Sequence, residues 1–247
     1  MRVILFGATG MVGKGVLLEC LEDPRVSAVL VVGRQPCNVV HAKLRQMIRS
    51  DFFHWDDARE DLKGYDACFF CLGVSSVGMD VSMYFHLTYD LTTALAETLA
   101  SVNPAITFCY VSGEGTDSTE RGRSMWARVK GRTENELFRL LPKALAFRPG
   151  YIQPLKGVRS KTGWYQIMYD IVGPLYPVLS RVLGPHVTTT ENVGRAMINA
   201  AAHGYATRVL ENVDINALAR AGTKSAEPTR RPGPFGPGTS EGRRHSS

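Results

Sequence analysis

The residues most clearly arranged for chemistry form a glycine-rich turn near the start of the chain. The turn reads Gly7-Ala8-Thr9-Gly10-Met11-Val12-Gly13, follows the apolar run 3–6 and opens a helix. In such a turn Gly7 permits the tight bend, Gly10 lets the backbone approach a pyrophosphate, and Gly13 allows close helix–strand packing. The free amides of the helix N-terminus then face the anion. The pattern predicts a dinucleotide site; a glycine turn without a ligand is the alternative.

The end of the second apolar run indicates which dinucleotide this is. An NAD site usually places Asp or Glu about 20 residues after the glycines, where the carboxylate accepts hydrogen bonds from the ribose hydroxyls. Here the run ends Val31-Val32-Gly33-Arg34, without a carboxylate. The Arg34 guanidinium can instead form a forked contact with a 2′-phosphate. We therefore expect NADP rather than NAD, the alternative being that Arg34 is a solvated surface side chain.

The elements that must position this turn alternate between short apolar runs and amphipathic helices. This alternation predicts a doubly wound parallel α/β sheet of the Rossmann type, because parallel strands need helical crossovers. We expect one domain over residues 1–220, with a small substrate-binding region from about residue 150, and a tail at 221–247. The expected strands are 3–6, 28–32, 52–55, 67–72, 105–111, 144–147 and 208–210, and the expected helices follow the glycine turn and cover 82–100, 125–141 and 191–202.

Charge and composition limit the classes of partner that the chain can bind. The formal net charge is +6, but residues 221–247 contribute +3 of it and the other 220 residues only +3, which is too little for a nucleic-acid footprint. Nine of the 27 tail residues are Pro or Gly, so we expect the tail to be disordered. We expect a small-molecule substrate of unknown identity and no nucleic acid.

Cysteine usage and hydropathy bear on the compartment. The five cysteines lie scattered and mostly in apolar runs, and the chain enters its first strand without a signal peptide, which favours a cytoplasmic location. No stretch approaches the roughly 18 uninterrupted apolar residues of a membrane span. An aromatic-rich stretch at 163–172 is expected to line a substrate pocket. Its alternative is an exposed surface that touches a membrane or a second subunit, so we expect a monomer or a homodimer.

Two further motifs resemble functional sites but lack residues or geometry that such sites need. Cys68 and Cys71 have metal-site spacing, but residues three apart on a strand point to opposite faces, so we expect two structural thiols and no metal. Ser112-Gly113-Glu114-Gly115 lacks the preceding glycine of a hydrolase elbow, where Tyr110 stands instead.

Together these motifs resemble the short-chain dehydrogenase/reductase superfamily, in particular its atypical branch and, within it, the Tat-interacting-protein-like subgroup. The resemblance covers about residues 1–215. It is carried by the glycine spacing, by Cys71-Leu72-Gly73, Tyr110-Val111-Ser112 and Arg148-Pro149-Gly150, and by Asp90 where most relatives have Asn. It implies hydride transfer on a carbonyl or alcohol. It also implies that the cofactor contacts Gly7, Thr9, Gly10, Met11, Val12, Gly13, Arg34, Asp56, Leu72, Gly73, Lys130 and Pro149.

The catalytic positions implied by the resemblance are Ser112, Lys130 and a Tyr four residues before the Lys. That third position is Trp126. An indole N–H donates hydrogen bonds but does not titrate usefully, so Trp126 cannot act as the general acid or base. Three interpretations stay open: an oxidoreductase with another proton donor (Tyr151, Tyr165 or Lys130), a silent NADP-binding regulator or redox sensor with a protein partner, or a Trp that lies off the site.

Overall fold

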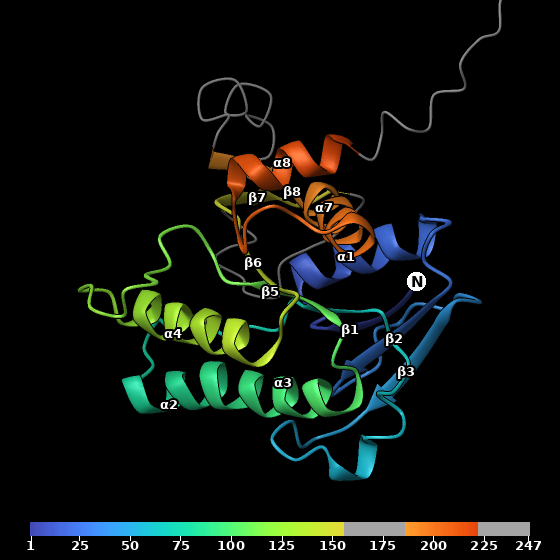
Figure 1. The fold of residues 1–247 in the computed structure, drawn as a ribbon, viewed down its shortest axis with the longest axis horizontal. Helices are drawn as coiled ribbons and strands as arrows, with labels where there is room; N and C mark the ends of the chain where they lie inside the picture. The colour runs from blue at the N-terminus through green and yellow to red at the C-terminus, as the bar shows by residue number, and fades with distance from the viewer. Residues whose placement is uncertain (156–185, 222–247) are drawn as a thin grey trace, which may run out of the picture.

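A parallel sheet forms the centre of the molecule in the computed structural model, which describes residues 1–155 and 186–221 (Figure 1). The sheet has seven strands in the order β3-β2-β1-β4-β5-β6-β9, and each neighbouring pair is parallel. The expected doubly wound fold is therefore confirmed. The strands are β1 (Arg2–Phe6), β2 (Ala28–Gly33), β3 (Leu44–Ile48), β4 (Ala67–Phe70), β5 (Thr107–Val111), β6 (Ala144–Arg148) and β9 (Val209–Glu211).

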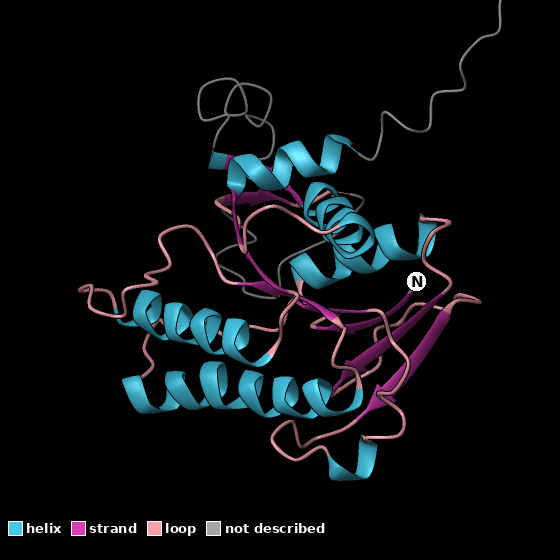
Figure 2. Cartoon of the chain, in the orientation of Figure 1, coloured by secondary structure: helices cyan, strands magenta, loops and turns pink. Residues whose placement is uncertain are grey.

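Helices cover both faces of the sheet, as Figure 2 shows. One face carries α1 and α7, which pack against each other, and α8 packs on α7 (Figure 1). On the other face α3 and α4 lie side by side. The helices are α1 (Met11–Glu22), α2 (Val81–Phe85), the π-helical turn η2 (His86–Asp90), α3 (Leu91–Val102), α4 (Met125–Leu140), α7 (Thr190–His203) and α8 (Asn212–Ala221), with a short 3₁₀ turn η1 (Asp56–Ala58).

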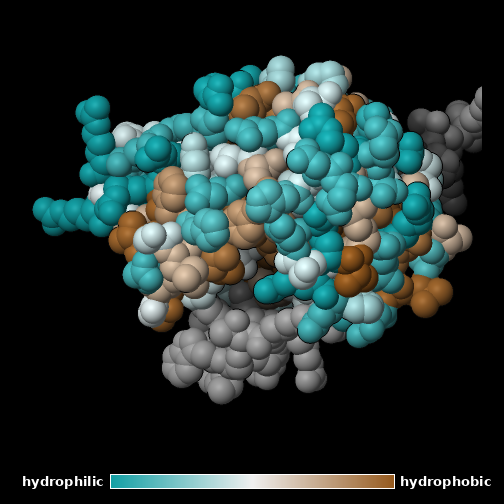
Figure 3. All heavy atoms as spheres, turned by 90° about the horizontal axis from the view of Figure 1, so that it is seen from below, coloured by the Kyte–Doolittle hydropathy of each residue, from teal (hydrophilic) through white to brown (hydrophobic). Residues whose placement is uncertain are grey.

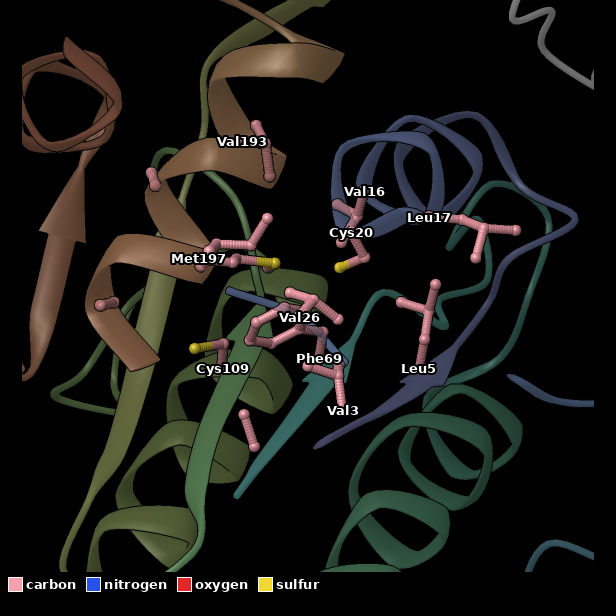
Figure 4. Packing of buried hydrophobic residues seen from close by; sticks show 14 of the residues in the cluster. Val3, Leu5, Val16, Leu17, Cys20, Val26, Phe69, Cys109, Val193 and Met197 are labelled. Carbon is pink, nitrogen blue, oxygen red and sulfur yellow. The ribbon is translucent and has the colours of Figure 1, made fainter. Parts of the chain in front are cut away.

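Each face of the sheet has its own apolar core, because the strands of a parallel sheet are buried on both sides. On the α1 side, Val16 and Cys20 of α1 and Met197 of α7 meet Phe69 of β4, as Figure 4 shows. On the opposite side, strand residues such as Phe70 pack against α3 and α4. The two cores fix the carboxyl ends of β1, β2 and β4 at one edge of the sheet.

One expected strand is wrong. Residues 52–55 form no strand, and β3 instead lies at Leu44–Ile48, where it pairs with β2 at the sheet edge. The aromatic residues that suggested a strand are buried for another reason. Phe52 and Trp55 pack on Phe6 with ring centroids 6.2 and 5.7 Å away, and the Trp55 indole donates a 3.0 Å hydrogen bond to the Phe52 carbonyl. A polar edge strand carries little apolar signal, so the pattern favoured the wrong segment.

Other differences lie towards the C-terminus. The expected helix over 82–100 is divided by η2, and the pattern missed α8 and a second, two-stranded sheet of β7 (Tyr151–Gln153) and β8 (Val187–Thr189). The aromatic-rich stretch 163–172 and the tail from 222 lie outside the described residues.

In Figure 3 the lower face is mainly hydrophilic, with hydrophobic groups scattered over it. No helix in the described part of the chain is both long enough and apolar enough to cross a membrane.

Candidate functional site

The glycine turn has the geometry that its spacing predicts. Gly7 has a φ of +81°, a region that side-chain-bearing residues rarely adopt. The Gly10 amide donates a 2.8 Å hydrogen bond to the Gly7 carbonyl, which closes the turn. A Cβ on Gly13 would stand 2.2 Å from the Gly7 carbonyl oxygen, so α1 can approach β1 this closely only with glycine there. Gly10 is the N-cap of α1 and carries no capping side chain, which leaves the first amides of the helix accessible to an anion.

A cavity of about 530 Å³ opens beside this turn, at the carboxyl ends of β1, β2 and β4. Chain crossovers reverse direction at β1, which is where ligands bind in open α/β sheets. The cavity brings together Gly7, Thr9, Arg34, Leu72 and Gly73, which come from three strands. Its walls are formed by Gly7, Ala8, Thr9, Val31, Val32, Gly33, Arg34, Gln35, Ser50, Phe52, Phe53, Leu72, Gly73, Val74, Leu87 and Leu91.

Arg34 gives this cavity its charge. Among the residues that line it, Arg34 carries the charged side chain and there is no carboxylate. Arg34 is exposed, and within residues 1–155 and 186–221 its guanidinium has neither an ion-pair nor a hydrogen-bond partner. The guanidinium is therefore available to a ligand anion.

The far end of the cavity is aromatic, a feature that the sequence analysis missed. Phe53 lies in the wall and stacks on His86, with ring centroids 4.3 Å apart and planes 6° from parallel. His86 in turn pairs through Nδ1 with the Asp90 carboxylate at 2.9 Å, so Asp90 is engaged within η2. Asp56, which was expected to contact the cofactor, is not among the lining residues and points to solvent with 97% of its side chain exposed. The available signal for Phe53 was the aromatic pair Phe52-Phe53 itself.

Ser112 and Lys130 are brought together at the carboxyl end of β5. The Lys130 ammonium donates a hydrogen bond to the backbone carbonyl of Ser112, while the buried Ser112 hydroxyl donates at 3.2 Å to the Phe147 carbonyl. Burial lowers the pKa of Lys130 from 10.5 to about 8, and the nearby negative charge of Glu134 partly opposes this. Lys130 is thus a cation that can lose its proton near neutral pH.

Trp126 occupies the helix turn before Lys130. Because residues four apart lie on one helix face, the two side chains share a face of α4. A Cβ on Gly115 would lie 3.7 Å from the Trp126 ring, which places the indole beside the loop that follows β5. Of the other proposed proton donors, the Tyr151 hydroxyl donates a 3.0 Å hydrogen bond to Gln153, and Tyr165 lies outside the described residues.

The cysteine pair behaves as a structural feature. Cys68 belongs to the core beside α3 and α4, whereas Cys71 packs against the core on the α1 side, so the prediction of opposite faces is confirmed. Burial raises the pKa of both thiols. Burial therefore favours the protonated thiol at both positions.

Known proteins resemble the chain in sequence over part of its length, and no family model matches it. It is 28% identical over 144 residues to leucinostatins biosynthesis cluster protein T of Purpureocillium lilacinum (57% of this chain, 52% of the relative). It is 26% identical to the mitochondrial protein FMP52 of Meyerozyma guilliermondii (62% and 65%) and 26% identical to protein HTATIP2 of Rattus norvegicus (61% and 62%). The chain thus spans about half to two thirds of the length of these curated relatives.

Solved structures resemble the fold more completely. The Bordetella bronchiseptica enzyme WbmF, solved in complex with NAD+, superposes with a TM-score of 0.60 and 18% identity over 94% of this chain and 81% of WbmF. YwfH, an NADPH-dependent reductase involved in bacilysin biosynthesis, gives a TM-score of 0.60 and 10% identity over 86% and 97%. The chain therefore shares its fold with an enzyme solved with NAD+ and with an NADPH-dependent reductase.

Proposed function

From the premise that this chain has the fold and the motifs of the atypical short-chain dehydrogenase/reductases, we propose that it is an oxidoreductase that binds NADP(H) and acts on a carbonyl or alcohol. Residues 1–220 form the cofactor domain in this proposal, with the substrate region beginning at about residue 150. We also propose a cytoplasmic location and a monomer or homodimer.

The observation that carries the proposal is the charge of the cavity. A dinucleotide diphosphate fits the glycine turn, because the amides of the first turn of α1 face it and no capping side chain competes. The Arg34 guanidinium, which has no partner among the described residues, suits a 2′-phosphate. The lining residues offer no carboxylate to accept a hydrogen bond from the 2′-hydroxyl of NAD. Phe53 offers a flat surface against which a purine can stack.

Near Ser112 and Lys130, a bound nicotinamide would supply or accept a hydride, which is one proton together with two electrons. Side chains of the protein would bind the cofactor and orient the substrate. Lys130, held on the Ser112 carbonyl, would hold ribose hydroxyls as a charged donor. The Ser112 hydroxyl would turn from the Phe147 carbonyl to orient a substrate oxygen. Met11, Val12 and Gly10 would contact the diphosphate, and Leu72, Gly73 and Pro149 would flank the cofactor.

The test is a fluorescence titration of the purified full chain with NADPH and with NADH. We expect NADPH to bind at least tenfold more tightly. Arg34→Ala should remove that preference by weakening NADPH alone, by about 1.5–3 kcal/mol for a lost charge-assisted contact. Arg45→Ala is the matched control, because Arg45 is an exposed arginine on the neighbouring strand that does not line the cavity. Equal affinities that do not change in Arg34→Ala would remove the NADP assignment.

A second function is favoured by Trp126. With an indole in place of the proton-exchanging phenol, the same site would bind NADP(H) without turnover and act as a redox sensor for a protein partner. Incubation with NADPH and a panel of aldehydes, ketones and α-dicarbonyls separates the two functions. Tight binding with no consumption of NADPH would favour the sensor, and carbonyl-dependent loss of NADPH absorbance would favour the enzyme.

A further inference from the structure

We propose that His186, oriented by Glu114, is the proton-exchanging residue of the substrate site and takes the part that Trp126 cannot perform. The inference rests on the proposed function, because it assigns a catalytic residue to that same site. It is carried by a side-chain pair that lies 72 residues apart in the chain and meets at the carboxyl edge of the sheet.

The pair has the arrangement of an imidazole held by a carboxylate. Nδ1 of His186 forms a hydrogen bond and ion pair with Oε1 of Glu114. A carboxylate can only accept, so Nδ1 must carry the proton of this bond. In the neutral ring Nε2 is then the free acceptor, and in the charged ring it is a donor. An orienting carboxylate behind a histidine is the recurring design of general acid–base sites.

Both residues are reachable. The His186 side chain is 63% exposed and that of Glu114 is 42% exposed, so protons can be exchanged with solvent and with a ligand. Two other titratable groups lie nearby: Lys130 donates a hydrogen bond to the Ser112 carbonyl, and the Tyr151 hydroxyl donates one to Gln153.

The backbone places the pair next to the predicted catalytic residues. Glu114 follows Ser112 by two residues, and its amide donates a 2.9 Å hydrogen bond to the carbonyl of Pro149. Gly150 lies between the partners: a Cβ there would stand 2.5 Å from Oε2 of Glu114 and 2.3 Å from the His186 carbonyl oxygen. The loop after β5, the turn after β6 and the start of β8 therefore converge, and Trp126 flanks the same loop at Gly115.

The chemistry balances with the cofactor of the proposed function as reductant. When a carbonyl carbon is reduced, its oxygen gains an electron pair and needs one proton. The two electrons and the carbon-bound hydrogen come from a reduced nicotinamide, and Nε2 of the charged His186 gives the proton. His186 is left neutral with its proton on Nδ1, where Glu114 holds it, and solvent returns the charged form. Glu114 acts through His186 and is a positioning residue.

The first test reads the ring directly and needs neither cofactor nor substrate. Nitrogen-15 spectra of the full chain at pH 8.5 distinguish the two neutral tautomers, and His186→Gln assigns the signal. We expect His186 to hold its proton on Nδ1 and to lose this preference in Glu114→Ala. His203 is an internal reference, because it is exposed and has no partner among the described residues. A His186 that carries its proton on Nε2 in the unmodified chain would overturn the proposal.

The second test separates catalysis from binding. His186→Gln should lower the rate of carbonyl-dependent NADPH oxidation about 100-fold or more, in the range of a lost general acid, with the Kd for NADPH changed less than twofold. His203→Gln should leave both unchanged. Turnover that is unaffected by His186→Gln, or NADPH binding without turnover on the whole carbonyl panel, overturns the assignment while the cofactor proposal stands. Failure to bind NADPH would instead refute the proposed function. The nitrogen-15 spectra would still show whether Glu114 fixes the tautomer of His186.

Discussion

Gly13 of α1 lies directly against Gly7 of the turn that follows β1, with room for no more than a hydrogen between the Gly13 α-carbon and the Gly7 carbonyl oxygen. The turn that carries this contact lines the cavity through Gly7, Ala8 and Thr9, just before α1 begins. In the proposed function, cofactor binding and helix–strand packing both depend on this glycine pair, and substitution can separate the two contributions.

Gly13→Ala is expected to reduce both the stability of the fold and the affinity for NADPH. A Cβ placed 2.2 Å from backbone oxygen forces α1 to move, which should cost about 1–3 kcal/mol of unfolding free energy and abolish NADPH binding. Gly10→Ala is the matched variant, because its Cβ would lie at 3.3 Å. It should keep the thermal midpoint and weaken NADPH binding. A Gly13→Ala protein with unchanged midpoint and affinity would show that the turn is not the site.

The buried ion pair between Glu134 and Arg148 should contribute strongly to stability. Glu134 is fully buried on α4 and accepts from the Arg148 guanidinium, including a 3.0 Å bond from Nε. Glu134→Gln leaves the Arg148 guanidinium with the more exposed Glu211, at 3.2 Å, as its remaining carboxylate partner, and should cost about 3 kcal/mol in urea unfolding. Glu136→Gln removes a surface pair with Arg139 on the same helix and should cost less than about 1 kcal/mol. Similar losses in the two variants would contradict this assignment.

Stability should depend on pH through Lys130. Burial lowers its pKa from 10.5 to about 8, so the unfolded chain binds more protons than the folded chain between these values. Stability contributed by this residue therefore rises as pH increases from about 8 to about 10.5. We expect the unfolding free energy of the unmodified chain to rise relative to that of Lys130→Met over this window. Using the difference cancels the opposing titration of the buried thiols, and a flat difference would show that Lys130 is not perturbed.

Trp126→Tyr should change which residue exchanges the proton. A phenol one helical turn before Lys130 would supply a proton donor at the position where the resemblance to the short-chain dehydrogenase/reductases implies a Tyr. We expect Trp126→Tyr to support carbonyl-dependent NADPH oxidation even when combined with His186→Gln. Trp126→Phe, which lacks the hydroxyl, should not rescue the His186→Gln protein. Equal rates in the Tyr and Phe double variants would mean that position 126 does not face the substrate.

The sequence pattern predicted correctly those features that depend on residues close together in the chain. Buried parallel strands appear in the sequence as continuous apolar runs. The glycine spacing predicted both the tight turn at Gly7 and the close packing at Gly13, because the positive φ of Gly7 and the contact between Gly13 and Gly7 arise within one short segment. The same holds for Cys68 and Cys71, whose opposite orientation follows from the alternation of side chains along a strand. The apolar pattern wrongly predicted a strand at 52–55, where the residues are buried because their aromatic rings pack on Phe6.

The sequence by itself determined the sheet, the order of most elements and the place of the phosphate-binding turn, since these depend on periodicity and on glycine geometry. Only the tertiary structure decided which side chains face one another: Phe53 on His86, Glu134 on Arg148, and Glu114 on His186. These contacts join residues far apart in the chain, and they are fixed by how helices and loops pack on the sheet. No spacing in the sequence encodes that packing, because it arises from the combined burial of both cores.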